Sequence, residues 1–262
     1  MSITRLIIIS ASLFVIVLQF TAQGSAKIDP ESIVGIWLFD DGKGAIAEDL
    51  SGNGNDGKLM KEPKWVDGKF GKALEFNGTD NYVDFGSGAS LDITNEITIV
   101  AWTFPSNQTF NHQDIVGKPS AYILGHMDPG VIVRSYINDG GWFGVNYSKE
   151  FNNYVDKWFH FAFTYDRSEL KVYVNGTLDG KGARGGAIVI NKNPVVVAHS
   201  SESQGFNAFY KGVVDDIAIF NAALSEDDIK SIMSQGLSRA LGMTAVSHAG
   251  KLTTTWATVK VQ

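Results

Sequence analysis

The sequence predicts an all-β fold, a two-sheet antiparallel sandwich with one short helix near the C-terminus. Clusters of Gly, Asn, Asp and Ser recur about every 8 to 20 residues between Ile33 and Val214, with no helical period between them. β-branched and aromatic runs fill the intervals between these clusters. A helical pattern begins only after Leu224. Together these features indicate short strands joined by tight turns.

The N-terminus has the composition of an export signal. Arg5 precedes an apolar run from Leu6 to Phe20, and small residues, among them Gly24 and Ala26, follow it. A run of about 15 apolar residues is short for a bilayer span, which needs about 20. We therefore expect residues 1–26 to be a signal peptide and the protein to be secreted, periplasmic or displayed at the cell surface. An uncleaved anchor is the alternative.

Two strands are indicated most strongly. Ile97–Trp102 is rich in β-branched residues, and Trp158–Tyr165 places Phe159, Phe161, Phe163 and Tyr165 on one face at a period of two. We expect that aromatic face to belong to the core, and we expect Trp37, Trp102 and Trp158 to be core residues as well.

A hairpin follows these strands. The run Leu170–Val174 is separated from Thr177–Leu178 by Asn175 and Gly176 alone. Asn-Gly suits a type I′ turn, because both central residues of that turn need a positive φ.

The helix is predicted from its capping pattern. Ser225 and Asp228 have the spacing of a capping box, and Glu226 and Asp227 stand where the helix dipole favours negative charge. Gly236 is a stop signal. We expect a domain over residues 27–236 and a β-rich tail over 237–262 that packs on the sandwich or on a partner.

Composition limits the classes of partner. The chain has no cysteine, and its 28 acidic against 22 basic residues give a net charge of −6. Disulfides, thiol nucleophiles and Cys-zinc sites are therefore excluded. The acidic balance disfavours nucleic acid and anionic lipid surfaces as partners. After signal cleavage we expect no membrane insertion.

Seven segments of the chain follow one another in a familiar order: Val34–Asp40, Asp49–Gly57, Gly71–Val83, Thr98–Trp102, Trp158–Asp166, Val172–Gly176 and Gly212–Ser225. In this order the chain resembles the laminin-G-like, or concanavalin A-like, lectin jelly-roll domains of exported bacterial proteins. The resemblance implies two antiparallel sheets packed face to face and a short helix near the C-terminus. It implies no single activity, because such domains bind glycans or proteins, act as spacers, or are enzymes.

A catalytic constellation is not indicated. Sandwich-fold glycoside hydrolases need facing carboxylates, and the Glu-x-Asp-x-x-Glu strand that usually supplies them does not occur. Phe209–Gly212 echoes one strand motif of alginate lyases, but the accompanying Gln-x-His motif is missing. The histidines stand apart from one another, and His160 is interpreted as a satisfied structural residue of its strand. We expect no catalytic residues; an enzyme on the same fold is the less favoured alternative.

Polar and aromatic residues alternate in one stretch suited to sugar recognition. Rings stack on the C–H faces of sugars while amides and carboxylates bond the hydroxyls. We therefore predict that a glycan or glycoprotein binds at Trp142, Tyr147, Asn138, Asp139 and Asn146. Asn107, Phe110, Asn111 and His112 form a second such loop. The alternatives are that Trp142 and Phe143 belong to the core, and that the domain is a structural or protein-adhesion module without glycan specificity.

A structural Ca²⁺ is the last expectation. Jelly-roll topology commonly brings the terminal strands together, and Ca²⁺ takes six to eight oxygen ligands. Oxygen-bearing residues near both strands are candidate ligands: Asp40, Asp49, Asn53, Asp215 and Asp216. At a period of two, Asp215 shares a face with Val213, Ile217 and Ile219. The alternative is that Asp215 accepts backbone N–H bonds, and that Asp49 and Asp56 form Asx turns.

Overall fold

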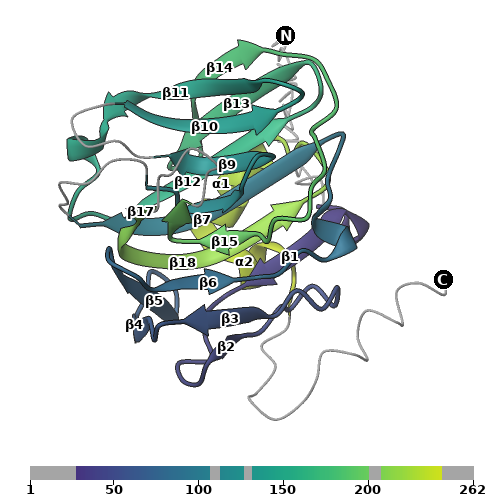
Figure 1. Cartoon of the computed structure of the whole chain (residues 1–262). Helices are drawn as coiled ribbons and strands as arrows, with labels where there is room; N and C mark the ends of the chain where they lie inside the picture. Colours follow the sequence, from purple (N-terminus) through teal and green to yellow (C-terminus); the bar gives the residue numbers. More distant parts are fainter. Residues whose placement is uncertain (1–27, 107–112, 127–131, 201–207, 244–262) are drawn as a thin grey trace, which may run out of the picture.

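A computed structural model describes residues 28–106, 113–126, 132–200 and 208–243 (Figure 1). Two eight-stranded antiparallel sheets pack face to face, which confirms the predicted sandwich. We call the sheet that contains β7 and β18 sheet A and the other sheet B.

Sheet A carries the long central strands. In spatial order it contains β14 (Thr177–Ala183), β13 (Glu169–Val174), β12 (Phe159–Tyr165), β7 (Ile97–Pro105), β18 (Lys211–Phe220), β5 (Lys72–Asn77) and β4 (Lys64–Asp67), and β1 (Ile33–Trp37) pairs with β18.

Sheet B consists mostly of shorter strands. Its order is β11 (Trp142–Glu150), β10 (Ile132–Asn138), β9 (Tyr122–His126), β8 (Val116–Lys118), β15 (Val196–Val197), β6 (Tyr82–Asp84), β3 (Gly57–Met60) and β2 (Ile46–Ala47). β16 (His199–Ser200) and β17 (Ala208–Phe209) form a separate ribbon. Short 3-10 turns lie at Pro30–Ser32, Ala89–Leu91 and Phe151–Asn153.

The main core lies between the two sheets. Phe161, Phe163 and Tyr165 are fully buried there, and Phe159 packs against them, so the predicted aromatic face is confirmed. Trp37 stacks on Phe85 with ring centroids 3.7 Å apart.

The other two tryptophans expected in the core lie on the outer face of sheet A. Trp102 is buried there, in register with Asp215 and His160 of the neighbouring strands. Trp158 is only half-buried and meets the ring of Phe104 edge to face, so its assignment to the core was wrong.

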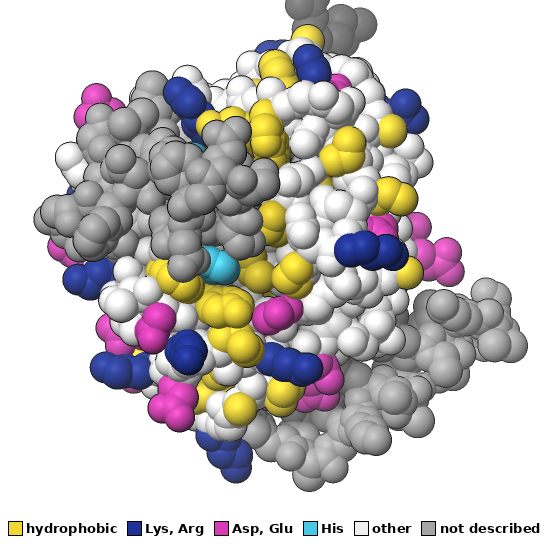
Figure 2. All heavy atoms as spheres, viewed as in Figure 1, with side chains coloured by type: hydrophobic (Ala, Val, Ile, Leu, Met, Phe, Trp, Pro, Cys, Tyr) yellow, Lys and Arg dark blue, Asp and Glu magenta, His cyan; other side chains and the backbone are white. Residues whose placement is uncertain are grey.

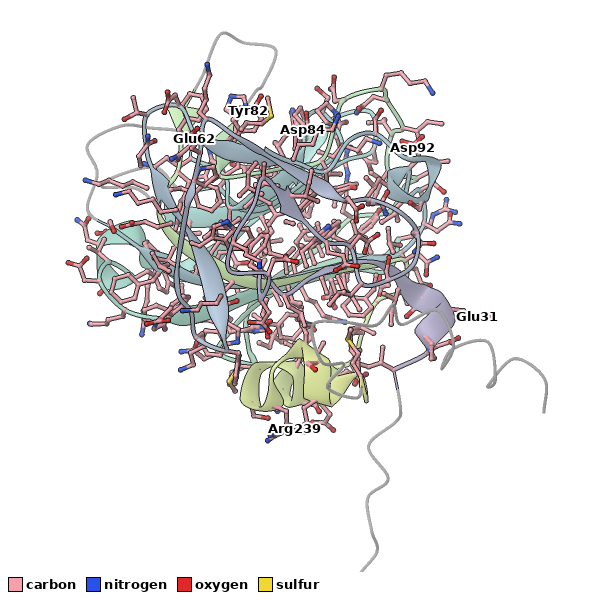
Figure 3. The ribbon with its side chains drawn as sticks, turned by 90° about the horizontal axis from the view of Figure 1, so that it is seen from below. Glu31, Glu62, Tyr82, Asp84, Asp92 and Arg239 are labelled. Atoms are coloured by element: carbon pink, nitrogen blue, oxygen red, sulfur yellow. The ribbon has the colours of Figure 1, made fainter. Side chains whose placement is uncertain are left out.

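Two helices cover part of the outer face of sheet A. α1 (Glu226–Gln235) begins with the predicted capping box between Ser225 and Asp228. α2 (Leu237–Ala240) was not predicted. Figure 3 shows the helices on one side of the molecule and the labelled Tyr82 and Asp84 of sheet B on the opposite side. Among the described residues, no helix is long and apolar enough to cross a membrane.

The C-terminal boundary lies beyond the predicted one. Leu237 and Leu241 are buried in the cluster that joins the helices to sheet A, so the packed domain continues past Gly236. The expected β-rich stretch Leu252–Val259 lies outside the described residues, as does the signal segment 1–26.

The predicted hairpin is confirmed in its detail. Asn175 and Gly176 have φ values of 48° and 76°, which fit a type I′ turn between β13 and β14.

A bulge in β18 corrects the predicted face of Asp215. The register with β7 shifts between Asp215 and Ala218, and Asp216 has a φ of 46°. A bulge inserts one extra residue and so exchanges the faces of the residues that follow. Ile217 and Ile219 therefore point into the main core, whereas Asp215 lies beside Trp102 on the outer face.

Candidate functional site

The outer face of the β10–β11 hairpin carries the predicted binding stretch. Tyr136 pairs with Gly144, and Arg134 pairs with Asn146. Side chains alternate between the faces of a strand. Ser135 and Val145, the neighbours of these residues, are buried, so Arg134, Tyr136 and Asn146 project outward.

Trp142 is exposed at the end of this face. Its side chain keeps 40% of its surface accessible, which rules out the alternative of a core tryptophan. Its ring meets that of Tyr136 nearly at a right angle, with an interplanar angle of 75° and centroids 5.9 Å apart. Phe143, by contrast, packs against the main core.

Tyr136 lies across a glycine. A Cβ atom placed on Gly144 would lie 2.4 Å from the Tyr136 ring, so only glycine permits this position of the ring. The close approach is a common reason for glycine inside a strand.

Arg134 connects the polar groups of this face. Its Nε donates to Oδ1 of Asn146 at 2.7 Å, and its Nη1 donates to the hydroxyl oxygen of Tyr136 at 3.3 Å. We call Arg134, Tyr136, Trp142 and Asn146 the hairpin platform. Each of these side chains is held by a neighbour in the set, so the platform is ordered without a ligand.

Three predicted ligand-binding residues do not belong to the platform. Tyr147 is 1% exposed, and its hydroxyl lies 3.0 Å from the Ser135 hydroxyl and 3.2 Å from the Ala162 carbonyl oxygen. Because Tyr147 is in the core, its assignment to a ligand-binding surface was wrong. Burial raises the pKa of its hydroxyl well above the usual range.

Asn138 and Asp139 build the turn of the hairpin. Asn138 accepts a bond from Gly140 N at 3.0 Å and donates to the Ser120 carbonyl at 3.1 Å. Asp139 accepts from Arg184 Nε at 2.7 Å, and that hydrogen bond lowers the pKa of the carboxyl. Both amide atoms of Asn138 and the carboxylate of Asp139 are thus engaged within the protein, which corrects their predicted role as ligand-binding groups.

A histidine–carboxylate pair lies beside the platform and was not predicted. His126 Nδ1 lies 2.5 Å from Oδ1 of buried Asp114, and the His126 ring meets the Tyr136 ring edge-on at 5.7 Å. Gly125, with a φ of 68°, precedes His126, and the β9–β10 register shifts there. The sequence indicates only that the histidines stand apart from one another, and this carboxylate partner of His126 is supplied by the folded chain.

A second aromatic group lies on the same face of the molecule. His199 stacks on Phe209 with centroids 4.6 Å apart, and Tyr82 lies 4.9 Å from His199. Figure 2 shows hydrophobic side chains gathered on this face beside a histidine, with charged groups around them. The predicted polar-aromatic loop of Asn107, Phe110, Asn111 and His112 lies outside the described residues.

His160 is structural, as expected, but it is not satisfied. It is fully buried, and burial lowers its pKa to about 3. Among the described residues, neither ring nitrogen has a hydrogen-bond partner, and the same holds for Trp102 Nε1 and Asp215 Oδ1 in the same row across sheet A. A buried neutral histidine without an exposed edge offers no acid–base group to a substrate.

The five predicted metal ligands are engaged in hydrogen bonds to the protein. Asp49 accepts bonds from Ile36 N, Ser51 N, Ser51 Oγ and Asn55 N at 2.9 to 3.1 Å. Asn53 donates to the carbonyl oxygens of Ile33 and Val34. The bond from Ser51 N to Asp49 is the Asx turn of the alternative interpretation.

Backbone N–H groups also reach the other three acids. Asp40 accepts from Lys72 N at 2.8 Å, Asp215 from Phe70 N at 2.9 Å and Asp216 from Leu237 N at 3.0 Å. Within the described parts of the chain, no three His, Cys, Asp or Glu side chains are grouped to hold a metal ion. The alternative of hydrogen-bonded acids accounts for the contacts of these residues without a metal ion, and a calcium melting experiment decides between the two interpretations.

The segment Phe209–Gly212, which resembles a strand motif of alginate lyases, does not present its tyrosine to a substrate. Tyr210 is fully buried, and its hydroxyl bonds to the Thr103 hydroxyl. Its burial keeps the hydroxyl away from any substrate.

Comparison with known proteins agrees with the seven-segment pattern. Residues 77–230 match the family Laminin_G_3, described as the concanavalin A-like lectin/glucanases superfamily. The chain belongs to this superfamily. No protein of curated function matches the chain in sequence.

Solved structures with the superfamily fold include several binding domains. Domain 4 of a GH43 extracellular arabinanase from Geobacillus stearothermophilus, in complex with arabinotriose, has a TM-score of 0.62 at 19% identity, covering 77% of this chain and 98% of that one. The binding domain of Paraclostridial Mosquitocidal Protein 1 has a TM-score of 0.62 at 17% identity, with coverages of 78% and 52%. The receptor binding domain of botulinum neurotoxin C/D mosaic serotype has a TM-score of 0.62 at 15% identity, with coverages of 78% and 51%.

The chain thus spans about half of each toxin domain. At these identities the likeness shows the fold alone. Membership of the concanavalin A-like lectin/glucanases superfamily is what the comparisons add to the fold.

Proposed function

We propose that this protein is an exported, non-catalytic binding module that recognises a polysaccharide or glycoconjugate through the hairpin platform. The observation that carries the proposal is the exposed Trp142 ring beside ordered polar groups of Arg134, Tyr136 and Asn146. The neighbouring arabinanase domain, whose structure holds arabinotriose, supports a glycan as the class of ligand.

The physical basis is the amphipathic surface of a sugar. A pyranose or furanose presents C–H groups that pack on an aromatic face, while its hydroxyls need hydrogen-bond partners at the edge. The platform supplies one exposed ring, that of Trp142. The polar groups of Arg134, Tyr136 and Asn146 lie on the same pair of adjacent strands, β10 and β11. Because these groups are already held in place, little side-chain entropy is lost on binding.

The test compares Trp142→Ala with wild type on a glycan array and in polysaccharide pull-down assays. We expect wild type to bind at least one glycan class and W142A to bind it at least tenfold more weakly. Leu178→Ala is the matched control, because Leu178 is 38% exposed and lies on β14 of sheet A, away from the platform. Equal binding by W142A and wild type would move the site elsewhere.

Two other functions have distinct outcomes in the same experiment. If wild type binds no glycan but captures extracellular proteins, the domain is a protein-adhesion module, as the receptor binding domains among its structural neighbours suggest. If reducing or unsaturated sugars are released, the protein is an enzyme, and the His126–Asp114 pair beside the platform becomes the first residue pair to mutate.

A further inference from the structure

Arg134 is the donor in both side-chain hydrogen bonds of the hairpin platform. Arg134 is the hub, and a guanidinium only donates hydrogen bonds. Both of its bonds within the platform end on oxygen atoms, one on Asn146 Oδ1 and one on the Tyr136 hydroxyl oxygen. Each of these two oxygen atoms therefore already accepts one hydrogen bond from within the platform.

Within the described residues, these side chains also carry N–H and O–H donors that the two bonds from Arg134 do not use. Asn146 is exposed, and in the described structure its Nδ2 group, with two N–H donors, bonds to no protein acceptor. The Tyr136 oxygen accepts from Arg134, which leaves its O–H hydrogen to donate elsewhere. Trp142 is exposed, and its indole nitrogen has a donor only. A ligand thus meets a ring surrounded by donors.

We propose that the platform recognises an acidic sugar, through the carboxylate or sulfate oxygens of a uronate-containing or sulfated glycan. This inference rests on the proposed glycan-binding function and names its substrate class. Anionic oxygens accept several hydrogen bonds without donating any, so they match a surface of donors, and bonds to ionised groups are about twice as strong as neutral ones. The hydroxyls of a neutral sugar both donate and accept hydrogen bonds, and their donor groups find fewer partners on a surface of donors.

The overall charge of the protein bears on where a preference for acidic glycans can come from. A net charge of −6 does not attract polyanions at long range. Preference for an acidic glycan must therefore come from local hydrogen bonds at the platform, which makes it sensitive to single substitutions there.

The experiment uses pairs of related ligands in which one member carries more negative charge than the other. Isothermal titration calorimetry compares oligogalacturonate with its methyl ester, and sulfated with unsulfated chondroitin oligosaccharides, which separates uronate from sulfate recognition. We expect wild type to bind at least one acidic member at least tenfold more tightly than its uncharged or less charged counterpart. If oligogalacturonate and its methyl ester bind with equal affinity, and sulfated chondroitin binds no more tightly than unsulfated chondroitin, the inference is overturned while the proposed function stands.

Two variants test the role of the donors. Asn146→Asp replaces the two N–H donors of the amide by a carboxylate oxygen, and we expect it to weaken acidic-ligand binding at least tenfold and to lower the ratio of acidic to neutral affinity. Asn152→Asp is the control, because exposed Asn152 lies beyond β11 and adds the same charge off the platform. Arg134→Gln removes the guanidinium that donates to Asn146 and Tyr136, and it is expected to reduce the ratio of acidic to neutral affinity as well.

The outcomes distinguish a failure of the acidic preference from a failure of glycan binding itself. Loss of acidic preference in N146D, with N152D unchanged and both variants melting cooperatively, supports the inference. An N146D variant that keeps the full preference for the acidic ligand overturns it. If wild type and W142A bind none of the four ligands and no other glycan, the proposed function itself fails.

Discussion

Raising the pH from 6.5 to 8 is expected to destabilise this protein. Asp215 and Asp216 lie at the β18 bulge under the β4–β5 turn and the start of α2, and both are buried. Burial raises the pKa of Asp215 to about 8, with a further increase from Asp216, and raises that of Asp216 to about 7, with a further increase from Asp40.

The sign follows from proton binding. The folded state holds protons on these carboxyls at pH values where the unfolded chain has released them, so folding is favoured at low pH and loses this contribution as pH rises through the folded pKa. His160, whose folded pKa is lowered to about 3, acts in the opposite direction, but only below its unfolded pKa of about 6.5. Between pH 6.5 and 8 the two aspartates therefore dominate.

The magnitude can be worked out for Asp215. Each pH unit over which a group is protonated in the folded state and ionised in the unfolded state changes the unfolding free energy by about 1.4 kcal/mol. From pH 6.5 to 8, Asp215 alone lowers the free energy of unfolding by about 1.6 kcal/mol, because the group is half ionised in the folded state at pH 8.

Urea denaturation at the two pH values, in buffer with EDTA, measures this change. Asp215→Asn keeps an acceptor for Phe70 N but cannot ionise, so its pH dependence should be smaller than that of wild type. Asp67→Asn is the control, because Asp67 lies in the same turn and is exposed. A D215N variant with the pH dependence of wild type, or a wild-type protein that gains stability toward pH 8, would refute the reasoning.

Two further predictions concern the predicted metal ligands. Asp49→Ala removes a buried carboxylate that accepts four hydrogen bonds, so we expect the free energy of unfolding to fall by about 3 kcal/mol, measured by urea denaturation with Asp80→Ala as an exposed control. Millimolar Ca²⁺ added after EDTA treatment should leave the thermal midpoint at pH 7 unchanged, because these acids already accept backbone bonds; a rise in the midpoint would restore the calcium site.

The predicted fold was confirmed where it depended on local rules. The Asn175–Gly176 turn and the capping box of Ser225 and Asp228 are determined by a few consecutive residues, and both formed as expected. The bulge at Asp216 was missed, because no residue type there signals an extra residue and only the pairing with β7 reveals it.

Two of the four platform residues, Trp142 and Asn146, were predicted from the sequence, and strand geometry explains why the other two were not. Trp142 and Asn146 are four residues apart on β11 and share its outer face, whereas Tyr147 has the opposite parity and is buried. Applying the period of two to this stretch would have excluded Tyr147. Arg134 and Tyr136 come from the neighbouring strand, and their meeting with Asn146 and Trp142 depends on the hairpin register.

The His126–Asp114 pair illustrates the limit of one-dimensional reasoning. The two residues are twelve positions apart in the sequence, and β8 and most of β9 lie between them. Only the antiparallel turn of β8 into β9, with the bulge at Gly125, brings the ring back to the carboxylate.

Gly144 has a consequence for how relatives of this protein should be compared. The glycine never needs to touch a ligand, yet the missing side chain sets the height and tilt of the Tyr136 ring above the sheet. A relative that keeps all four platform residues but carries a larger residue at this position would present its tyrosine lifted and turned. Divergence of specificity within the superfamily can therefore proceed through a position beneath the recognition surface, where a comparison restricted to contact residues would register no change.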